Sequence, residues 1–204
     1  MPVIVVANPK GGVGKSTLST NLAGYLASRG HSVMLGDVDR QQSALTWLSL
    51  RPPQLPAIGT WDTHGEIVRP PKGTTHVVLD TPAGLHGKRL DEVMKIADKV
   101  VIPLQPSIFD IHATHAFVRE LLAHRRSDKV KIAIVGMRTR EGTISSDHLR
   151  AFVDSLKVPV LGFLRDTQNY VHLAAHGLTL WDVTSSRFER DIEQWKPILD
   201  WVEA

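Results

Sequence analysis

The sequence contains no cysteine. This excludes disulfide bridges, zinc sites built from thiolates and iron–sulfur clusters held by cysteine. It also lacks any apolar run near the roughly 20 residues that a bilayer-spanning helix needs. The first residues carry no basic segment, and their apolar stretch is too short for a signal peptide, so we interpret it as a strand and expect a cytoplasmic location.

A strong charge of either sign is missing as well. The chain has 24 Lys and Arg residues against 21 Asp and Glu, which gives a net charge of +3 and a pI of about 9.3. A basic excess this small is compatible with a polyanion partner such as DNA, and equally with a role in solubility alone.

The 204 residues, of which 42% are hydrophobic and 22% charged, fit one folded α/β domain over residues 1–204. Apolar runs alternate with helical patterns along it. The predicted strands are 3–7, 33–36, a short one near Ala57, 77–79, 99–103, 130–137 and 160–163. The predicted helices are 15 to about 30, 43–50, a short one near Thr63, 90–97, 108–123, 144–156 (capped near Thr143 or Ser145), 170–175 and 188–201.

Strand and helix alternate, and the strands are nearly continuous apolar runs. This predicts a mostly parallel, twisted sheet with helices on both faces. Ligands of such sheets bind beyond the carboxyl ends of the strands.

A glycine-rich stretch joins the first predicted strand to the first helix. We call residues 10–17 the phosphate loop: Lys10-Gly11-Gly12-Val13-Gly14-Lys15-Ser16-Thr17. It is a variant of the P-loop pattern G-x-x-x-x-G-K-[ST], with Pro9 at the position of the first glycine. Glycines let backbone N–H groups turn toward phosphates, Lys15 can reach the β- and γ-phosphates of a nucleotide, and the Ser16 hydroxyl can ligate Mg²⁺.

Lys10 distinguishes this loop from the ordinary pattern. Two lysines in one empty loop would repel each other, so the second lysine suggests a phosphate that both share. The alternative is a solvated surface lysine.

Acidic residues follow two of the predicted strands. Asp37 and Asp39 close the second strand and are expected to point to the same side of it, while Asp80 closes the third. Carboxylates at strand ends beside a P-loop can hold Mg²⁺, directly or through water, or orient a nucleophilic water. Their other common use is to cap a helix or a turn.

Together these motifs resemble the ParA/MinD family of deviant Walker A ATPases, which have a P-loop NTPase fold. The resemblance covers residues 10–17, 37–41 and 77–84 in order, and more weakly Leu164-Arg165 and 174–177. It implies ATP and Mg²⁺ as cofactors, and slow ATP hydrolysis inside a homodimer that forms when ATP binds.

The resemblance also implies residue roles. Lys10 would be the signature lysine that reaches the partner's phosphates, Asp39 would orient the hydrolytic water, and Asp80 would hold Mg²⁺ through water. The candidate Mg²⁺ residues are Ser16, Asp39 and Asp80. Residues 81–84 would form a switch segment. The chain departs from the family at Arg40, where relatives usually have proline, and this bears on the rate of hydrolysis.

Features that the sequence lacks exclude several branches of the family. Iron–sulfur branches need cysteine, and MinD-like members end in a basic amphipathic membrane helix. Here residues 188–204 form an apolar stripe under a mixed to acidic polar face, which favours a core-packed helix and no stable membrane binding. The chain starts at its first strand, so we expect no preceding helix-turn-helix domain. The small ParA proteins remain, with a MinD-like membrane regulator and a synthetase of the dethiobiotin-synthetase type as alternatives.

A small ParA protein would bind nucleoid DNA without sequence preference and would respond to a ParB-like protein or a cargo adaptor. Its cargo would be a plasmid, a chromosome or a protein assembly such as a chemoreceptor cluster or a carboxysome. The candidate DNA contacts are basic and lie in the C-terminal half. They are Arg138, Arg140, Arg165, Arg187, Arg190 and Lys196.

Overall fold

The computed structural model describes residues 1–61, 71–154, 156 and 158–204. Within these residues, seven strands form one sheet in the order β3-β2-β4-β1-β5-β6-β7, and all six pairs are parallel. The strands are β1 Val3–Val6, β2 Val33–Asp37, β3 Ile58–Gly59, β4 His76–Asp80, β5 Lys99–Leu104, β6 Lys131–Thr139 and β7 Val160–Arg165.

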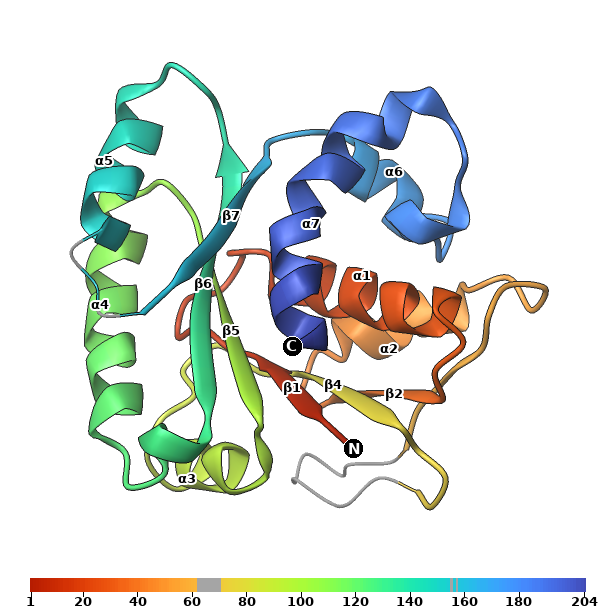
Figure 1. Cartoon of the computed structure of the whole chain (residues 1–204), viewed down its shortest axis with the longest axis horizontal. Coiled ribbons are helices and arrows are strands. Elements are labelled where there is room, and N and C mark those ends of the chain that lie inside the picture. The colour runs from red at the N-terminus through yellow and green to blue at the C-terminus, as the bar shows by residue number, and fades with distance from the viewer. Residues whose placement is uncertain (62–70, 155, 157) are drawn as a thin grey trace.

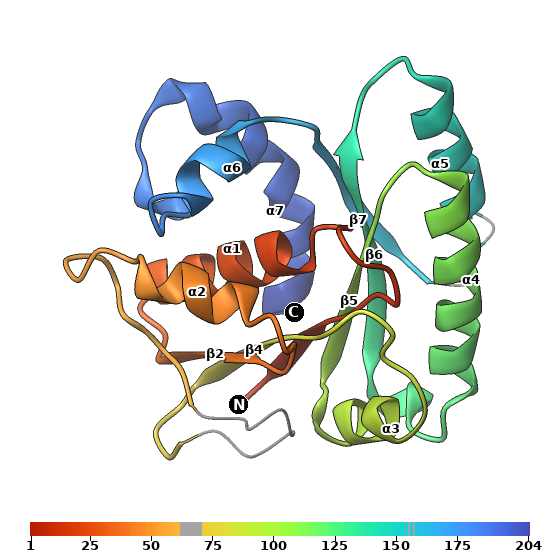
Figure 2. The ribbon, with the colours of Figure 1, turned by 180° about the vertical axis from the view of Figure 1, so that it is seen from behind.

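Seven α-helices cover the two faces of this sheet within the described residues. They are α1 Lys15–Ser28, α2 Ser43–Ser49, α3 Gly87–Ile96, α4 Ile108–Ala123, α5 Ile144–Asp154, α6 Asn169–Ala174 and α7 Glu189–Glu203. Helices α3, α4 and α5 lie on one side of the sheet and α1, α2, α6 and α7 on the other, as Figures 1 and 2 show from opposite directions. No helix of this described part is long and apolar enough to cross a membrane.

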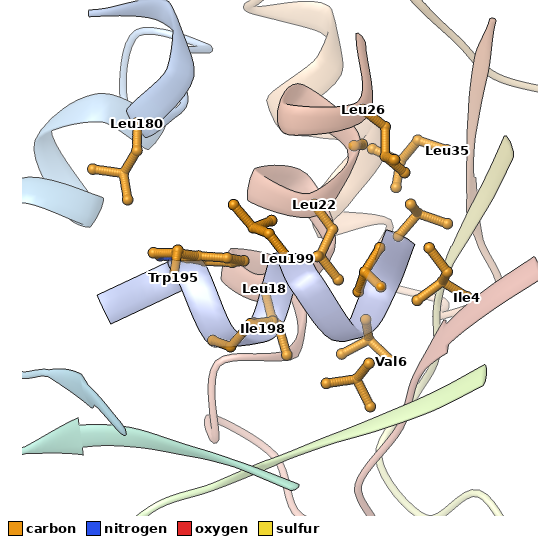
Figure 3. Close-up of a cluster of buried hydrophobic side chains, with 14 of the residues drawn as sticks. Ile4, Val6, Leu18, Leu22, Leu26, Leu35, Leu180, Trp195, Ile198 and Leu199 are labelled. Carbon is orange, nitrogen blue, oxygen red and sulfur yellow. The ribbon is translucent and has the colours of Figure 1, made fainter. Parts of the chain in front are cut away.

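Each face of the sheet has its own hydrophobic core, because alternate strand residues point to opposite sides. Val3 and Val5 of β1 pack toward α3 and α4, while Ile4 and Val6 pack toward α1 and α7. Figure 3 shows this second core, where Trp195 of α7 lies beside the leucines of α1. Trp195 is fully buried, so the terminal helix is a core element, as predicted.

The predicted order of strands and helices is confirmed, with small shifts at the ends. Helix α3 begins three residues before the predicted start, at Gly87, and β6 runs two residues further, to Thr139. Thr143 is the cap of α5, because its hydroxyl accepts a hydrogen bond from the N–H of Ser146 at 3.4 Å. The helix predicted near Thr63 lies outside the described residues.

The register of the central strands determines where a ligand can bind. Val6 at the end of β1 pairs with Asp80 of β4 and Val101 of β5, and Asp80 pairs with Asp37 of β2. The loops after β1, β2 and β4 therefore start from one edge of the sheet, at its centre.

Candidate functional site

The phosphate loop follows β1 and runs into the first turn of α1, which begins at Lys15. Gly12 and Gly14 have φ angles of +76° and +99°, which place their backbones in the left-handed region that glycine favours. A Cβ added at Gly12 would meet no atom within 4 Å, so open space lies over the loop. No side chain caps the N-terminus of α1, and its first turn holds no acidic residue, so the N–H groups there are available to an anion.

Hydrogen bonds from distant residues fix the shape of this loop. The buried Asn8 side chain donates to the Pro103 carbonyl at 2.8 Å and to the Thr114 hydroxyl at 2.9 Å, and it accepts from the N–H of Lys10 at 2.8 Å. Gln105 at the end of β5 donates to the Gly12 carbonyl at 2.7 Å. The loop is thus held in its shape before any ligand arrives.

Lys15 lies at the floor of the site. Its side chain is buried, and its Nζ donates to the Lys10 carbonyl at 2.8 Å. Burial lowers the pKa of Lys15, while the charges of Asp80 and Asp39 raise it. Among the described residues, no carboxylate lies within ion-pair distance of this ammonium, so the buried cation lacks a direct counter-ion.

Lys10 lies at the rim of the site and contacts the start of α4. Its Nζ is 4.0 Å from Asp110 Oδ1, and 43% of its side chain is exposed. An ion pair so long and so exposed contributes at most about 1 kcal/mol. Lys10 can therefore leave Asp110 for a phosphate at little cost.

Asp80 lies beneath Ser16, in the interior. Its Oδ1 accepts a hydrogen bond from the Ser19 hydroxyl at 3.1 Å. Burial raises the pKa of Asp80 to about 7, against the opposing effects of hydrogen bonds from Ser16 and Ser19 and of the Lys15 charge. A hydroxyl and a buried carboxylate side by side are the oxygen donors that Mg²⁺ prefers, so these residues fit that ion.

The two acidic residues after β2 differ from the prediction. The strand ends at Asp37, so Asp39 lies in the following loop and the two carboxylates do not share one strand face. Asp37 is buried and accepts from the N–H groups of Asp39 and Ala44, both at 2.9 Å. It thus orders the loop before α2, whereas Asp39 is half-buried beside the phosphate loop.

These elements enclose a cleft of about 650 Å³, within the range of small-molecule sites. Of the predicted site residues, Lys10, Val13 and Asp80 do not line it: Lys10 contacts Asp110, while Val13 and Asp80 are buried. The lining residues are Gly11, Gly12, Gly14, Lys15, Ser16, Thr17, Asp39, Arg40, Gln41, Ser43, Pro82, Ala83, Arg89 and Arg138.

Sequence reasoning missed three residues at this site. Asn8 and Gln105 shape the phosphate loop, and Arg89 of α3 lines the cleft. The position of Gln105 directly after β5 was the available signal, because β5 is the neighbour of β1 and ligands bind at strand ends. No sequence pattern marks Arg89.

The six basic candidates for DNA contact differ in their partners and in their exposure. Arg165 is paired with Asp191, whose side chain is fully buried, and Arg187 donates to Asn169 at 2.8 Å. Arg138 lines the cleft. The other three are well exposed and pair with carboxylates on the surface: Arg140 with Asp166, Arg190 with Glu141, and Lys196 with Glu193.

A family model matches most of the chain. Residues 4–180 match CbiA, described as the CobQ/CobB/MinD/ParA nucleotide binding domain. The chain belongs to this family. The matched region includes the phosphate loop, both acidic strand ends and the cleft.

Curated relatives agree with this family. Maintenance of carboxysome distribution protein A from Halothiobacillus neapolitanus is 30% identical over 167 residues, which are 78% of this chain and 76% of the relative. The protein of the same name from Gloeobacter kilaueensis is 38% identical over 112 residues (53% of this chain, 51% of the relative). Protein ParA from Rhizobium radiobacter is 33% identical over 115 residues (54% and 51%). The chain thus spans about half the length of the last two.

Solved structures of the family share the fold. The MinD cell division protein of Aquifex aeolicus has a TM-score of 0.77 at 19% identity, covering 100% of this chain and 98% of that one. An ATP complex of Cyanothece McdA has a TM-score of 0.71 at 16% identity, covering 100% and 95%. At these identities the likeness establishes the P-loop ParA/MinD fold, as the sequence motifs predict.

Proposed function

We propose that residues 1–204 form a ParA-type ATPase domain, which dimerises on binding ATP and Mg²⁺ and uses slow, partner-stimulated hydrolysis to position a cargo. The observation that supports this most is the buried Lys15 ammonium under an open, glycine-lined cleft. A buried cation without a direct counter-ion is favourable where an anion binds, and the N-terminus of α1 faces the same place.

The space available suits a nucleoside triphosphate. A second pocket of about 570 Å³, between the ends of β6 and β7 and α6, shares Gly14, Thr17 and Arg138 with the cleft. The phosphate loop then holds the phosphates, and the second pocket receives the nucleoside. The Cyanothece relative was solved with ATP, and another neighbour, a cobyrinic acid a,c-diamide synthase from Mycobacterium smegmatis, with an ATP analogue and magnesium.

Each site residue has a distinct task in this proposal. The loop N–H groups and Lys15 hold the β- and γ-phosphates, and Ser16 and Asp80 hold Mg²⁺, which neutralises charge on the transferred phosphoryl. Asp39, which lines the cleft, orients the attacking water. Lys10 leaves Asp110 and reaches the phosphates of the partner subunit.

The proposed partners follow from the relatives. Two of them are named for carboxysome distribution and one is a ParA protein, so a ParB-like protein or cargo adaptor is the expected stimulator. The ATP-bound dimer binds nucleoid DNA without sequence preference, through exposed basic residues such as Arg140, Arg190 and Lys196. The protein would then be cytoplasmic and nucleoid-associated.

Neither alternative function gains support from a specific contact. A MinD-like membrane helix needs a free apolar face, but Trp195, Ile198 and Leu199 of α7 are buried in the core. A synthetase of the dethiobiotin-synthetase type gives no reason for a second lysine at Lys10.

The test is DNA co-sedimentation with ATP, ADP or no nucleotide, at low and moderate salt. We expect DNA retention with ATP alone, sensitive to salt and independent of sequence. Lys15→Ala should abolish nucleotide binding and with it DNA retention. Lys10→Ala should still bind nucleotide but fail to dimerise or retain DNA. Lys95→Ala, an exposed lysine of α3, is the matched control and should behave as wild type.

Two outcomes would contradict the proposal. If the wild-type protein binds ATP but retains no DNA at any salt concentration, the nucleoid role is wrong. Pelleting with anionic liposomes in ATP would then test the membrane alternative. If retention is the same with ATP, ADP and no nucleotide, DNA binding is not under nucleotide control.

A further inference from the structure

The end of β6 contains a bulge that changes the direction of one arginine. Between the pairs Gly136–Phe163 and Thr139–Arg165, β6 advances by three residues while β7 advances by two. One residue of β6 is therefore extra in the ladder, at Met137 or Arg138. Beyond it the strands are joined again, because the Asp166 N–H donates to the Thr139 carbonyl at 3.0 Å.

Arg138 has an uncommon backbone conformation at this bulge. Its φ angle is +51°, in the left-handed region that residues with a Cβ avoid. Such a conformation is strained and persists where surrounding contacts impose it, often beside ligand sites. Bulges next to active sites commonly re-aim a side chain, and here the re-aimed side chain is basic.

The neighbouring Met137 connects this strand end to the phosphate loop. A Cβ built on Gly14 would lie 2.7 Å from the Met137 side chain, so β6 packs directly against the start of α1. Arg138 follows and lines both the cleft and the second pocket. The two other residues that line both, Gly14 and Thr17, belong to the phosphate loop itself. Arg138 thus lies at the junction where the phosphates of a nucleotide meet its nucleoside.

The guanidinium of Arg138 has no partner in the described part of the chain, in contrast to nearby arginines. Arg140 and Arg165 are held by Asp166 and Asp191, and Arg187 by Asn169. The Arg138 side chain makes no hydrogen bond or ion pair with any described residue, although the backbone of this residue is held in a strained conformation. A strained backbone that presents an unpaired cation to a phosphate cleft has a direct use when an anion binds there.

We propose that Arg138 is a nucleotide-binding residue, whose guanidinium contacts the α-phosphate and ribose side of the nucleotide in its own subunit. This inference rests on the proposed nucleotide site and adds to it a residue that no P-loop motif contains. Because ADP and ATP share the contacted part, Arg138 supports both equally and does not sense the γ-phosphate. The inference also removes Arg138 from the candidate DNA contacts.

The test is calorimetric titration of the full chain with ADP and with ATP in the presence of Mg²⁺. Arg138→Ala should weaken both nucleotides about tenfold or more, by the same factor, as expected for the loss of charge-assisted hydrogen bonds. Arg138→Lys should recover part of the affinity, since it keeps the charge but loses the planar fork. Arg119→Ala, an exposed arginine of α4 that lines neither pocket, is the control and should stay within about twofold of wild type.

Arg138→Gly separates binding from folding. Glycine adopts a φ of +51° without strain, so this variant should unfold at the same or a higher temperature than wild type, while it loses as much nucleotide affinity as Arg138→Ala. Wild-type affinity in Arg138→Ala or Arg138→Gly would overturn the inference. So would normal nucleotide affinity combined with lost DNA retention at saturating ATP, which would make Arg138 a DNA contact. Failure of the wild-type chain to bind either nucleotide would instead overturn the proposed function.

Discussion

The buried carboxyl of Asp80 makes the stability of the nucleotide-free protein depend on pH. Its pKa is raised from 3.8 to about 7, chiefly by burial. Between these two values the folded state keeps a proton that the unfolded state has already lost, so the folded state binds more protons. The free energy of unfolding therefore falls as pH rises, by about 1.4 kcal/mol per pH unit for this group, or about 4 kcal/mol in total.

Asp80→Asn removes this titration while it preserves the shape of the side chain. Urea denaturation in EDTA, without nucleotide, should show the variant gaining stability relative to wild type by about 2–3 kcal/mol between pH 5 and pH 7.5. The exposed Glu92→Gln serves as the control, and its difference from wild type should not change over this range. If wild type and Asp80→Asn depend on pH in the same way, the carboxyl is not held protonated by burial and the reasoning is refuted.

Three further predictions concern parts of the structure that support the site. Asn8→Ala loses three hydrogen bonds, two of them buried, and should lower the free energy of unfolding by about 3 kcal/mol in urea denaturation, whereas Ser28→Ala, which loses an exposed bond, should cost under about 1 kcal/mol. Arg51→Ala leaves Asp182, which is 1% exposed, without its bidentate partner at 2.8 and 2.9 Å, and should cost about 3–5 kcal/mol; a loss below 1 kcal/mol would show that the pair is dispensable. Gly14 has a φ of +99°, and a Cβ there would clash with Met137, whereas Gly30 has a φ of +83° and open space around it. Alanine at either position should lower the free energy of unfolding by about 1 kcal/mol or more. Only Gly14→Ala should also weaken ATP binding in a titration.

The sequence predicted the fold well because the deciding signals are local. Runs such as Val3–Val6 are continuous and apolar, which identifies strands buried on both faces of a parallel sheet. The glycines of the phosphate loop and the acidic residue that ends β4 are likewise recognisable from neighbouring residues alone. The role of Asp37 could not be predicted from the sequence, because aspartate serves both as a metal ligand and as a cap of helices and turns. Only its bonds to the N–H groups of Asp39 and Ala44 identify the second use.

Features that depend on pairing between distant segments could not be predicted. Arg138 looked like one basic residue among six, because its left-handed backbone follows from the bulge between β6 and β7 and not from its neighbours in sequence. The partner of Arg165, at the end of β7, is Asp191, which lies 26 residues further along in helix α7. Charge pattern alone could not tell these two arginines from the exposed Arg140.

The same long-range contacts explain how a loop of small residues keeps its shape. Glycines make the phosphate loop permissive, and a permissive loop loses much conformational entropy when a ligand orders it. Here folding already orders the loop, so its conformational entropy is lost before a ligand binds. Asn8 and Gln105 link the loop to β5, and the Gly84 N–H donates to the Pro9 carbonyl at 2.9 Å. Residue 84 belongs to the segment that the family resemblance implies is a switch, and this bond joins that segment to Pro9, directly before the phosphate loop.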